Sequence, residues 1–412
     1  MPNNKILFAL IPEKGHINPL IGVAQHLQAA GYELAFFAQT DISEQLNKAG
    51  LPQNVYTGAP STNSDKDFIT RGKAFVEQLK NKPWLRNWIK TLLIDAVPLQ
   101  LKLIEAAALH FQPALIVTDP MIYASAIAAH RLNIPWAGIS SSLNPVTPSA
   151  WQCELTHTLD TLDAPRKALF QSYGLKPRFK VSDAISPWLN IVFSTEAYIS
   201  RELSENDFSF YAGHSFPLHS RGDETDFPFH RLIPGTKKVY MSLGSQIYYH
   251  PHLFSAIAQA LLEKDIQLIF SLNELLSTPF AQQLPDNVIA VAYAPQLQLL
   301  KQVDLMVTHG GANSVMESLA HGVPVALLPI CNDQFLQAKF VTRAGAGIVL
   351  DPTQPIPEVY RQQLLPLLDH QSPVSGQAAK IGASFHRYGG AKAAAKLIAQ
   401  LHKTKKPMHP AL

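Results

Sequence analysis

A strand, a double-glycine turn and a helix follow one another at residues 303–321, and this order most constrains the fold. Val303 begins a short apolar run that predicts a buried strand, and Gly322 ends the segment that predicts a helix. The glycines at 310 and 311 remove side chains that would keep a ligand off the backbone. A strand that leads directly into a helix indicates a parallel α/β sheet.

The same turn predicts an anion site. Asn313 and Ser314 place polar groups and free N–H donors at the start of the helix, where the helix dipole favours negative charge. A diphosphate suits this arrangement. The alternative is a plain turn that uses glycine for its conformation and Asn or Ser as a helix cap, so the flanking residues must decide.

Two further turns flank this one, and each follows an apolar run that predicts a strand. The earlier turn carries Tyr293, Ala294 and Gln296, and the later one carries Asp333 and Gln334. In open parallel sheets, ligands bind at the carboxyl ends of the strands. The three turns therefore predict a single ligand site.

The ordered turns resemble the donor-binding signature of the UDP-glycosyltransferase superfamily, whose members have the GT-B fold and use nucleotide sugars. A glycine-serine turn after residues 238–242 also matches that superfamily. The resemblance implies uracil contacts for Tyr293, Ala294 and Gln296, diphosphate contacts for Gly244, Ser245, His309, Gly311, Asn313 and Ser314, a ribose contact for Glu317, and sugar contacts for Asp333 and Gln334. A solvated helix residue is the alternative for Glu317.

The first strand of the chain also ends in a glycine-histidine turn. Residues 5–11 predict a buried strand, and helical spacing begins at Leu20. Between them, Gly15 and His16 with a following Asn-Pro pair resemble the first signature of the same superfamily, in which the histidine is the catalytic base. The alternative is a histidine that only caps or solvates the helix start.

Asp119 follows a third predicted strand, at residues 114–118. In the superfamily that the chain resembles, an aspartate at this place hydrogen-bonds the catalytic histidine. Such a carboxylate holds the imidazole in one tautomer and stabilises the imidazolium that forms. The alternative is that Asp119 caps the helix expected after Pro120.

Strands alternate with helices along most of the chain, and its 412 residues suggest about two domains. The resemblance implies an α/β GT-B fold: two Rossmann-like domains whose parallel sheets face across a cleft, with a last helix that packs back on the first domain. The predicted boundaries are 1–212 for an acceptor-binding domain, 213–235 for a linker, 236–385 for a nucleotide-sugar-binding domain, and 386–412 for a crossover helix and frayed tail.

Three segments of the first domain do not fit this alternation. Residues 141–183 look irregular, and 188–194 is the last strand expected in the domain. Residues 82–110 predict a long helix broken near Pro98, and its tryptophans, Trp84 and Trp88, suit either core packing or a lip that touches a greasy acceptor or a membrane. The acidic residues at 65 and 67 stand in a polar loop, so no metal site is predicted.

Composition excludes several classes of protein. The net charge of +3 is small and scattered, which argues against nucleic acid as a partner. Cys153 and Cys331 cannot form a disulfide framework, which fits a reducing compartment. The amino-terminal apolar run is too short for a signal peptide, and none reaches membrane-spanning length. We therefore expect a cytoplasmic protein, with peripheral membrane contact left open.

Together these features predict an inverting transferase that moves a hexose, glucose by resemblance, from a UDP-sugar to a hydroxyl of a small lipophilic acceptor, with His16 as general base. The UDP-sugar is a substrate, and no cofactor is expected. The bacterial macrolide-type and zeaxanthin (carotenoid) glucosyltransferases resemble the chain most. The alternatives are a dTDP-sugar antibiotic-tailoring transferase, a GT-B nucleotide-sugar epimerase and a non-catalytic nucleotide-sugar-binding protein. Oligomeric state is not predicted.

Overall fold

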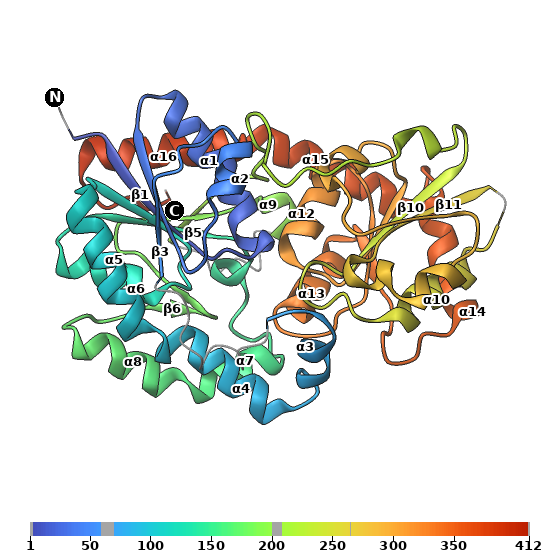
Figure 1. The fold of residues 1–412 in the computed structure, drawn as a ribbon, viewed down its shortest axis with the longest axis horizontal. Coiled ribbons are helices and arrows are strands. Elements are labelled where there is room, and N and C mark those ends of the chain that lie inside the picture. Colours follow the sequence, from blue (N-terminus) through green and yellow to red (C-terminus); the bar gives the residue numbers. More distant parts are fainter. Residues whose placement is uncertain (1–2, 59–69, 200–207, 264, 411–412) are drawn as a thin grey trace. The chain divides into compact units, whose positions relative to one another are not determined.

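The computed structural model describes residues 3–58, 70–199, 208–263 and 265–410 (Figure 1). The acidic residues at 65 and 67 lie outside these ranges. The chain forms two compact units. The first contains residues 1–68, 82–223 and 387–412, and the second contains residues 69–81 and 224–386.

The first unit has, in its described part, a seven-stranded sheet in the order β3-β2-β1-β4-β5-β8-β9, in which all neighbours are parallel. Its strands are β1 (Lys5–Leu10), β2 (Glu33–Ala38), β3 (Val55–Thr57), β4 (Leu115–Thr118), β5 (Trp136–Ser140), β8 (Leu189–Val192) and β9 (Ser209–Tyr211), with an antiparallel hairpin of β6 (Phe179–Lys180) and β7 (Asp183–Ala184). Its helices are α1 (Lys14–Ala29), α2 (Ser43–Lys48), α4 (Lys82–Lys90), α5 (Val97–Phe111), α6 (Tyr123–Arg131), α7 (Glu154–Thr161), α8 (Asp163–Ser172), α9 (Glu196–Ile199) and α16 (Gly390–Thr404).

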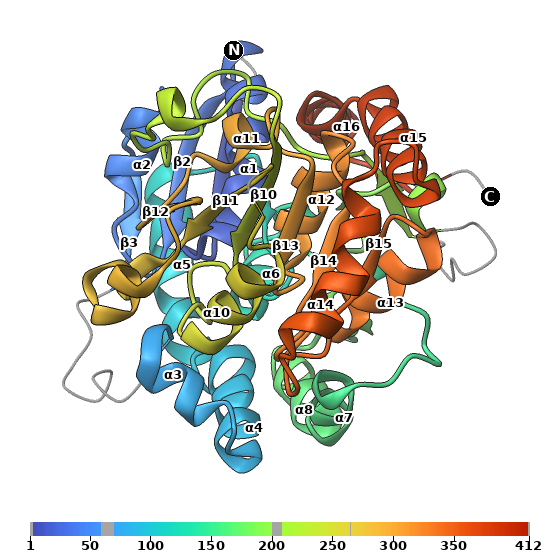
Figure 2. The same cartoon turned by 90° about the vertical axis from the view of Figure 1, so that its right-hand side faces the viewer.

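The second unit has a six-stranded parallel sheet in the order β12-β11-β10-β13-β14-β15 (Figure 2). Its strands are β10 (Lys237–Ser242), β11 (Ile266–Ser271), β12 (Val288–Val291), β13 (Leu305–Thr308), β14 (Val325–Leu327) and β15 (Gly347–Val349). Its helices are α3 (Gly72–Gln78), α10 (Pro251–Ala260), α11 (Gln296–Leu299), α12 (Ala312–Ala320), α13 (Gln334–Ala344), α14 (Pro357–Leu364) and α15 (Pro373–Tyr388). The predicted alternation of strands and helices is therefore confirmed in both units.

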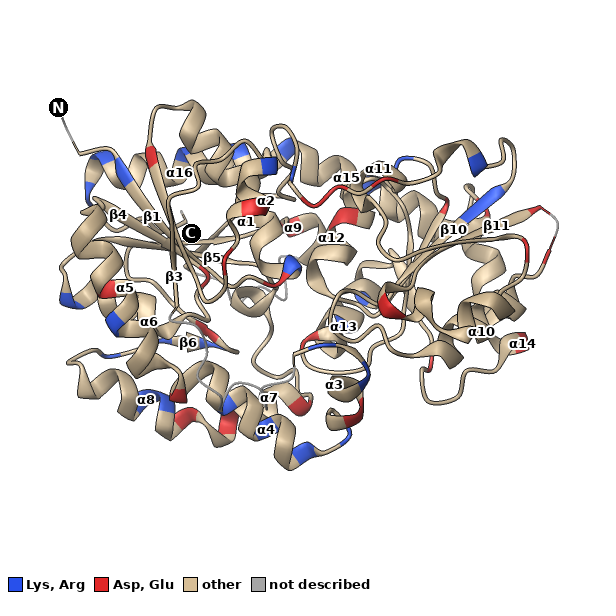
Figure 3. Cartoon of the chain, viewed as in Figure 1, with Lys and Arg blue, Asp and Glu red and all other residues tan. Residues whose placement is uncertain are grey.

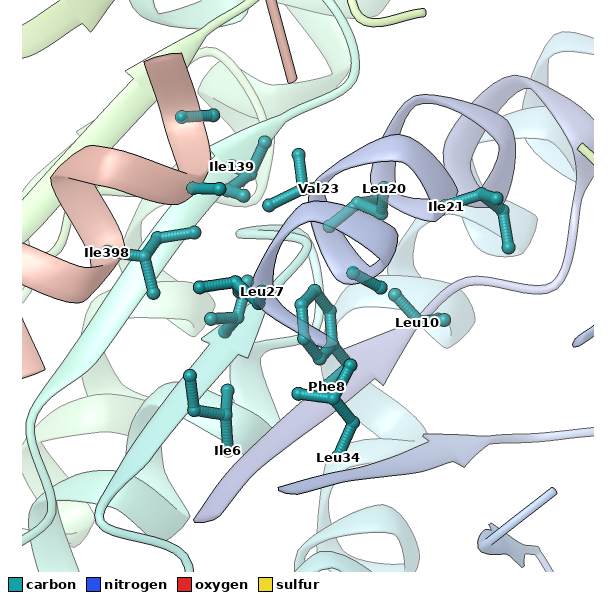
Figure 4. Close-up of a cluster of buried hydrophobic side chains, with 14 of the residues drawn as sticks. Ile6, Phe8, Leu10, Leu20, Ile21, Val23, Leu27, Leu34, Ile139 and Ile398 are labelled. Carbon is teal, nitrogen blue, oxygen red and sulfur yellow. The ribbon is translucent and has the colours of Figure 1, made fainter. Parts of the chain in front are cut away.

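The core of the first unit explains why its last helix returns to it. Alternate residues of β1, Ile6 and Phe8, lie on one face of the sheet and pack with Leu27 of α1 and Ile398 of α16 (Figure 4). All four side chains are fully or almost fully buried. The apolar stripe of α16 thus completes this core, and the predicted packing of the last helix on the first domain is confirmed.

Each sheet has one point where the strand order reverses. In the first sheet β1 lies between β2 and β4, and in the second β10 lies between β11 and β13. Connections leave the sheet on opposite faces at such a point, so the carboxyl ends of the two adjacent strands are left open to a ligand. The turns after β1 and β4, and those after β10 and β13, are therefore the positions where a site is expected.

Our expectation for residues 141–183 was wrong. Two helices, α7 and α8, occupy much of this segment, and their buried side chains include Leu159 and Phe170. Phe170 packs against the rings of Tyr123 and Phe179, with ring centroids 5.3 Å apart in both pairs. This aromatic cluster supplies the tertiary packing that stabilises α8, because so short a helix is marginal on its own. The strand at 188–194 is also not the last, because β9 pairs beyond it.

The tryptophans of α4 do not lie on the buried face of this helix. Leu85 and Ile89 are the buried residues of this helix, while Trp84 and Trp88 keep partial exposure and stack on each other with centroids 6.4 Å apart. The break predicted near Pro98 is confirmed: α4 leads into a π-helical turn, and Pro98 stands in the first turn of α5.

Two segments belong to units in which the sequence did not place them. Helix α3, which precedes α4, lies in the second unit, where the Gly72 N–H donates to the Gln246 carbonyl at 3.0 Å. Residues 213–223 of the expected linker pack on the first unit, where the Gln25 side chain bonds Leu218 and Ser220. Hydrogen bonds between segments far apart in the sequence accompany both placements, backbone to backbone in the first and from the Gln25 side chain in the second, and composition does not reveal them.

The carboxyl-terminal tail is held rather than frayed. Helix α16 continues to Thr404, and beyond it the Met408 N–H donates to the Trp188 carbonyl at 2.6 Å. Lys405 also donates to the carbonyl of Ala114 at 2.8 Å.

Basic and acidic residues are interspersed along both units (Figure 3). Among the described residues, none of the helices combines the length and apolarity that crossing a membrane requires.

The packing of α15 on α12 gives a testable expectation. A Cβ at Gly382 would lie 2.6 Å from the Leu319 carbonyl oxygen, whereas a Cβ at Gly376, in the same helix, would meet no atom within 4 Å. We expect Gly382→Ala to lower stability by about 1–3 kcal/mol, because the backbone of α12 must move. The matched variant Gly376→Ala should be neutral or stabilising by up to about 1 kcal/mol. Thermal and urea unfolding of both variants measures the difference, and equal effects would contradict it.

Candidate functional site

The turn after β1 and the turn after β4 bring together two predicted site residues. Helix α1 begins at Lys14, so His16 stands in its first turn rather than in the loop that the sequence suggested. His16 Nδ1 lies 2.7 Å from Asp119 Oδ2. The carboxylate is 1% exposed, whereas the imidazole is 27% exposed. The histidine can therefore reach a substrate, and the aspartate behind it cannot.

A serine that the sequence analysis did not identify completes this group. Ser141 Oγ lies 2.7 Å from His16 Nδ1 and donates a hydrogen bond to Asp119 Oδ2 at 3.1 Å. The other carboxylate oxygen accepts from the Met121 N–H at 3.0 Å. Asp119 thus contacts the histidine and also accepts a backbone N–H in the turn before α6. The alternative that it caps this helix is wrong, because the N-cap of α6 is Ile122.

The contacts at Nδ1 define what the histidine can do. An ionised Asp119 only accepts hydrogen bonds, so Nδ1 must carry the proton of the neutral imidazole. Nε2 is then left unprotonated and can take a proton from a substrate hydroxyl. The buried carboxylate would stabilise the resulting imidazolium. This is the arrangement of a general base with its orienting acid.

In the second unit, the imidazole of His309 fills the space beside two glycines. A Cβ at Gly244, after β10, would lie 2.7 Å from His309 Cε1, and a Cβ at Gly311 would lie 2.5 Å from His309 Nε2. Gly244 also has a φ of +76°. Neither glycine can be replaced without moving the ring. The glycines that we predicted for ligand approach are therefore required first by the histidine itself.

Burial sets the charge of His309. The protein around the ring excludes most water and lowers its pKa to about 4, although a hydrogen bond to the Ser242 backbone acts in the opposite direction. The imidazole is thus neutral at physiological pH. It stands directly before α12, whose first residues leave free N–H groups and the positive end of the dipole. The predicted anion-binding residues thus converge on the start of α12.

Glu317 and three other predicted residues form a hydrogen-bonded network. The Glu317 carboxylate, on α12, is 1% exposed and accepts from Gln296 at 2.7 Å and from Asn313 at 2.6 Å. Gln296 also lies 3.5 Å from Ser314 Oγ. The alternative of a solvated helix residue is wrong for Glu317. Both carboxylate oxygens are thus engaged in hydrogen bonds.

The two remaining turns differ in how they present their residues. Tyr293 is partly exposed, and its carbonyl accepts from Thr225 at 3.0 Å, while the adjacent Ala294 is 1% exposed. Asp333 is partly exposed at the start of α13. Gln334 is 5% exposed, and its side-chain Oε1 accepts from the Ile330 N–H at 2.8 Å and from the Cys331 N–H at 3.0 Å. In this conformation Gln334 stabilises its own turn.

The described residues contain no group of three or more His, Cys, Asp or Glu side chains placed to hold a metal ion. Cys331 is buried, and burial raises the pKa of its thiol to about 12. Such a thiol stays protonated and inert at neutral pH.

Comparison with known proteins agrees with this geometry. Residues 235–355 match the family described as UDP-glucoronosyl and UDP-glucosyl transferase. The chain is 24% identical, over 97% of its length and 98% of the relative, to the uncharacterized UDP-glucosyltransferase YojK of Bacillus subtilis. The chain is thus similar to UDP-glycosyltransferases along nearly its whole length, as its sequence predicted. This similarity supports an enzyme that transfers a glycosyl group.

Solved structures establish the fold of this chain. CalG4, the calicheamicin glycosyltransferase, is similar with a TM-score of 0.74 and 21% identity over 98% of this chain and 99% of that one. VinC, solved in complex with dTDP, is similar with a TM-score of 0.69 and 17% identity over 97% of this chain and 99% of that one. The predicted GT-B fold is therefore confirmed.

The neutral state of His309 predicts how stability depends on pH. The folded pKa of about 4 lies below the ordinary value of 6.5, so the unfolded chain binds the proton more readily. Stability from this group is present above about pH 6.5 and is lost as pH falls toward 4. Buried Asp183, whose pKa is raised to about 7, acts in the opposite direction over the same range.

We therefore expect the melting temperature to fall less between pH 7 and pH 5 in His309→Gln than in the wild type. The contribution of Asp183 is common to both proteins and cancels in the comparison. The exposed His409 is the matched control, and His409→Gln should follow the wild-type pH dependence. An unchanged pH dependence in His309→Gln would contradict the buried, neutral imidazole.

Proposed function

We propose that this protein is a UDP-dependent glycosyltransferase that moves a hexose, most simply glucose, from a UDP-sugar to a hydroxyl of a lipophilic small molecule, with inversion at the anomeric carbon. The observation that carries the proposal is the His16–Asp119 pair with Nε2 left as the base. The diphosphate site before α12 supports a nucleotide-sugar donor.

The proposed reaction is a single displacement. The acceptor hydroxyl gives its proton to His16 Nε2 as its oxygen forms a bond to the anomeric carbon. The bond between that carbon and the diphosphate oxygen breaks, and the electron pair leaves with the diphosphate. Attack from the face opposite the leaving group turns an α-linked donor into a β-linked product. Asp119 stabilises the imidazolium, which then returns its proton to water.

The departing diphosphate needs stabilisation of its negative charge. N–H donors at the start of α12, the side chains of Asn313 and Ser314, and the helix dipole supply it. His309 adds a polar ring, neutral before the donor binds. We therefore propose that transfer needs no divalent metal.

His16→Ala should lower kcat by about 10²–10⁴-fold, the usual contribution of one positioned base, and should leave UDP binding unchanged. His26, in the last turn of the same helix, is the matched control, because it stands outside the site. We expect His26→Ala to keep wild-type kcat. Steady-state kinetics and calorimetric titration with UDP measure both quantities, and near-wild-type turnover in His16→Ala would remove the assignment of the base.

The proposed identities of the donor's nucleotide and of its sugar rest on different observations. Tyr293 offers a ring face on which any base can stack, and the name of YojK supports UDP and glucose. The complex of VinC with dTDP supports the alternative, a dTDP-sugar transferase of the antibiotic-tailoring kind. Asp333 supports a sugar that retains its hydroxyls, because an exposed carboxylate accepts from neighbouring hydroxyl groups. A deoxysugar would leave this acceptor with fewer partners.

The acceptor would bind the first unit, near His16. Partly exposed aromatic residues, among them Trp84, Trp88 and Trp151, support a lipophilic acceptor. Phe170 does not contribute, since it lies in the buried aromatic cluster. The cations of α4 are engaged in ion pairs, Arg86 with Glu154 at 3.1 Å and Lys90 with Asp95 at 2.7 Å. The proposal therefore does not depend on attraction to an anionic membrane.

A matrix of donors and acceptors tests the substrate class. We expect highest turnover with UDP-glucose and lipophilic hydroxylated acceptors such as flavonoids, macrolides and carotenoids, and equal turnover with a chelator present. Mass spectrometry of the products measures transfer. A clear preference for dTDP-deoxysugars would select the alternative. Product formed without any acceptor would indicate an epimerase, and transfer only to hydrophilic sugars would contradict the lipophilic acceptor.

A further inference from the structure

A second buried acid, Asp183, lies beside the His16–Asp119 pair and is not used in the proposed reaction. It stands in β7 and is 1% exposed. Its Oδ2 lies 2.5 Å from Ser140 Oγ, and its Oδ1 accepts from Asn144 Nδ2 at 2.7 Å. Ser140 ends β5, and Asn144 begins the helical turn that follows. One carboxyl group therefore holds both ends of the short loop 140–144.

That loop carries Ser141, whose hydroxyl contacts His16 and Asp119. We propose that Asp183 is a positioning residue for the general base: by holding Ser140 and Asn144 it fixes the hydroxyl of Ser141 between His16 and Asp119. This inference deepens the proposed function and rests on it, because the position of His16 matters only if that histidine takes the acceptor proton.

The hairpin that bears Asp183 is itself tied to the segment after Asp119. The Ala184 N–H donates to the Pro120 carbonyl at 3.0 Å, and the Tyr123 hydroxyl donates to the Ser182 carbonyl at 2.8 Å. Asn144 Nδ2 also donates to Ser182 Oγ at 2.7 Å. Asp183 thus links two turns at the sheet edge, one with Ser141 and one with Asp119. A displacement of this link would move both hydrogen-bond partners of His16 Nδ1.

The surroundings of Asp183 allow the same geometry in either protonation state. Burial, and then the charge of Asp119, raise its pKa to about 7, while bonds from Asn144 and Ser140 act in the opposite direction, as does His16. Tyr123 on α6 and the buried Arg166 on α8 are the other titratable or charged groups packed here. An ionised Asp183 accepts from both partners. A protonated one can donate to Ser140 Oγ and still accept from Asn144.

A purely structural role would give a different pattern of effects. Loss of two buried hydrogen bonds destabilises any unit, and it lowers activity by reducing the amount of folded enzyme. A positioning role instead lowers kcat of the folded enzyme, leaves the donor KM unchanged, and depends on the presence of Ser141. Asn190 is a matched control for the structural effect. It is buried in the same unit and forms two hydrogen bonds with the backbone of Ser186, and none of the bonds described above joins it to His16 or Asp119.

The test is a double-mutant cycle with Ser141→Ala and Asp183→Ala, measured as kcat per folded enzyme. We expect Ser141→Ala and Asp183→Ala each to lower kcat about tenfold, since small misplacements of catalytic groups cost up to about 10². The double variant should lie within about threefold of Asp183→Ala, because both act through one hydroxyl. Losses that multiply in the double variant would overturn the proposal.

Two further variants keep the test decisive if Asp183→Ala folds poorly. Asp183→Asn is isosteric, and its amide can accept from Asn144 and donate to Ser140, so kcat should stay within about threefold of wild type. A loss as large as that of Asp183→Ala would overturn the proposal. Ser140→Ala removes one of the two bonds and should lower kcat with the donor KM unchanged. Asn190→Ala should lower the melting temperature and keep kcat.

The outcome separates the inference from the proposed function. Full activity in His16→Ala would reject the general base and with it the reason to position that residue. An inactive His16→Ala together with fully active Asp183→Ala and Ser140→Ala would leave the proposed function standing and reject the role of Asp183.

Discussion

The reversal of strand order in each parallel sheet is the constraint on which the site depends. Connections leave on opposite faces at that point, so the ends of the two central strands are not covered by a crossing helix. In the first unit this opens the turns of His16 and Asp119, and in the second it opens the turns of Gly244 and His309. The proposed proton acceptor lies at the opening in the first unit, and the proposed anion site lies at the opening in the second.

In the second unit, the volume of the His309 side chain determines the geometry of the turns more than backbone flexibility does. The ring of His309 occupies the places where Cβ atoms of residues 244 and 311 would stand, so the two glycines and the histidine form one packing unit. A ring enclosed in this way stays neutral, as its lowered pKa shows. In the proposed donor site, a diphosphate would therefore meet N–H dipoles and a polar ring rather than a fixed positive charge.

The sequence could predict those parts of the fold and site that follow from local order along the chain. Apolar runs located the central strands, and residues directly after them, such as His16, Asp119 and His309, could be placed at the sheet edges. Asp183 could not, since its partners at 140 and 144 approach it only through tertiary packing. The helices α7 and α8 were missed because they are short and depend on tertiary packing, such as the burial of Phe170 among other aromatic rings.

The buried polar groups of both units follow one physical rule. A carboxylate removed from water is costly unless its oxygens accept hydrogen bonds, and Glu317, Asp119 and Asp183 each have at least two such donors. The donors are themselves residues of the site, so satisfying the carboxylate also fixes their positions. A chain that buries acids beside its reactive groups therefore obtains an ordered site before any substrate binds. The hydrogen bonds that offset desolvation are the same ones that hold the base and the donor-binding residues in place.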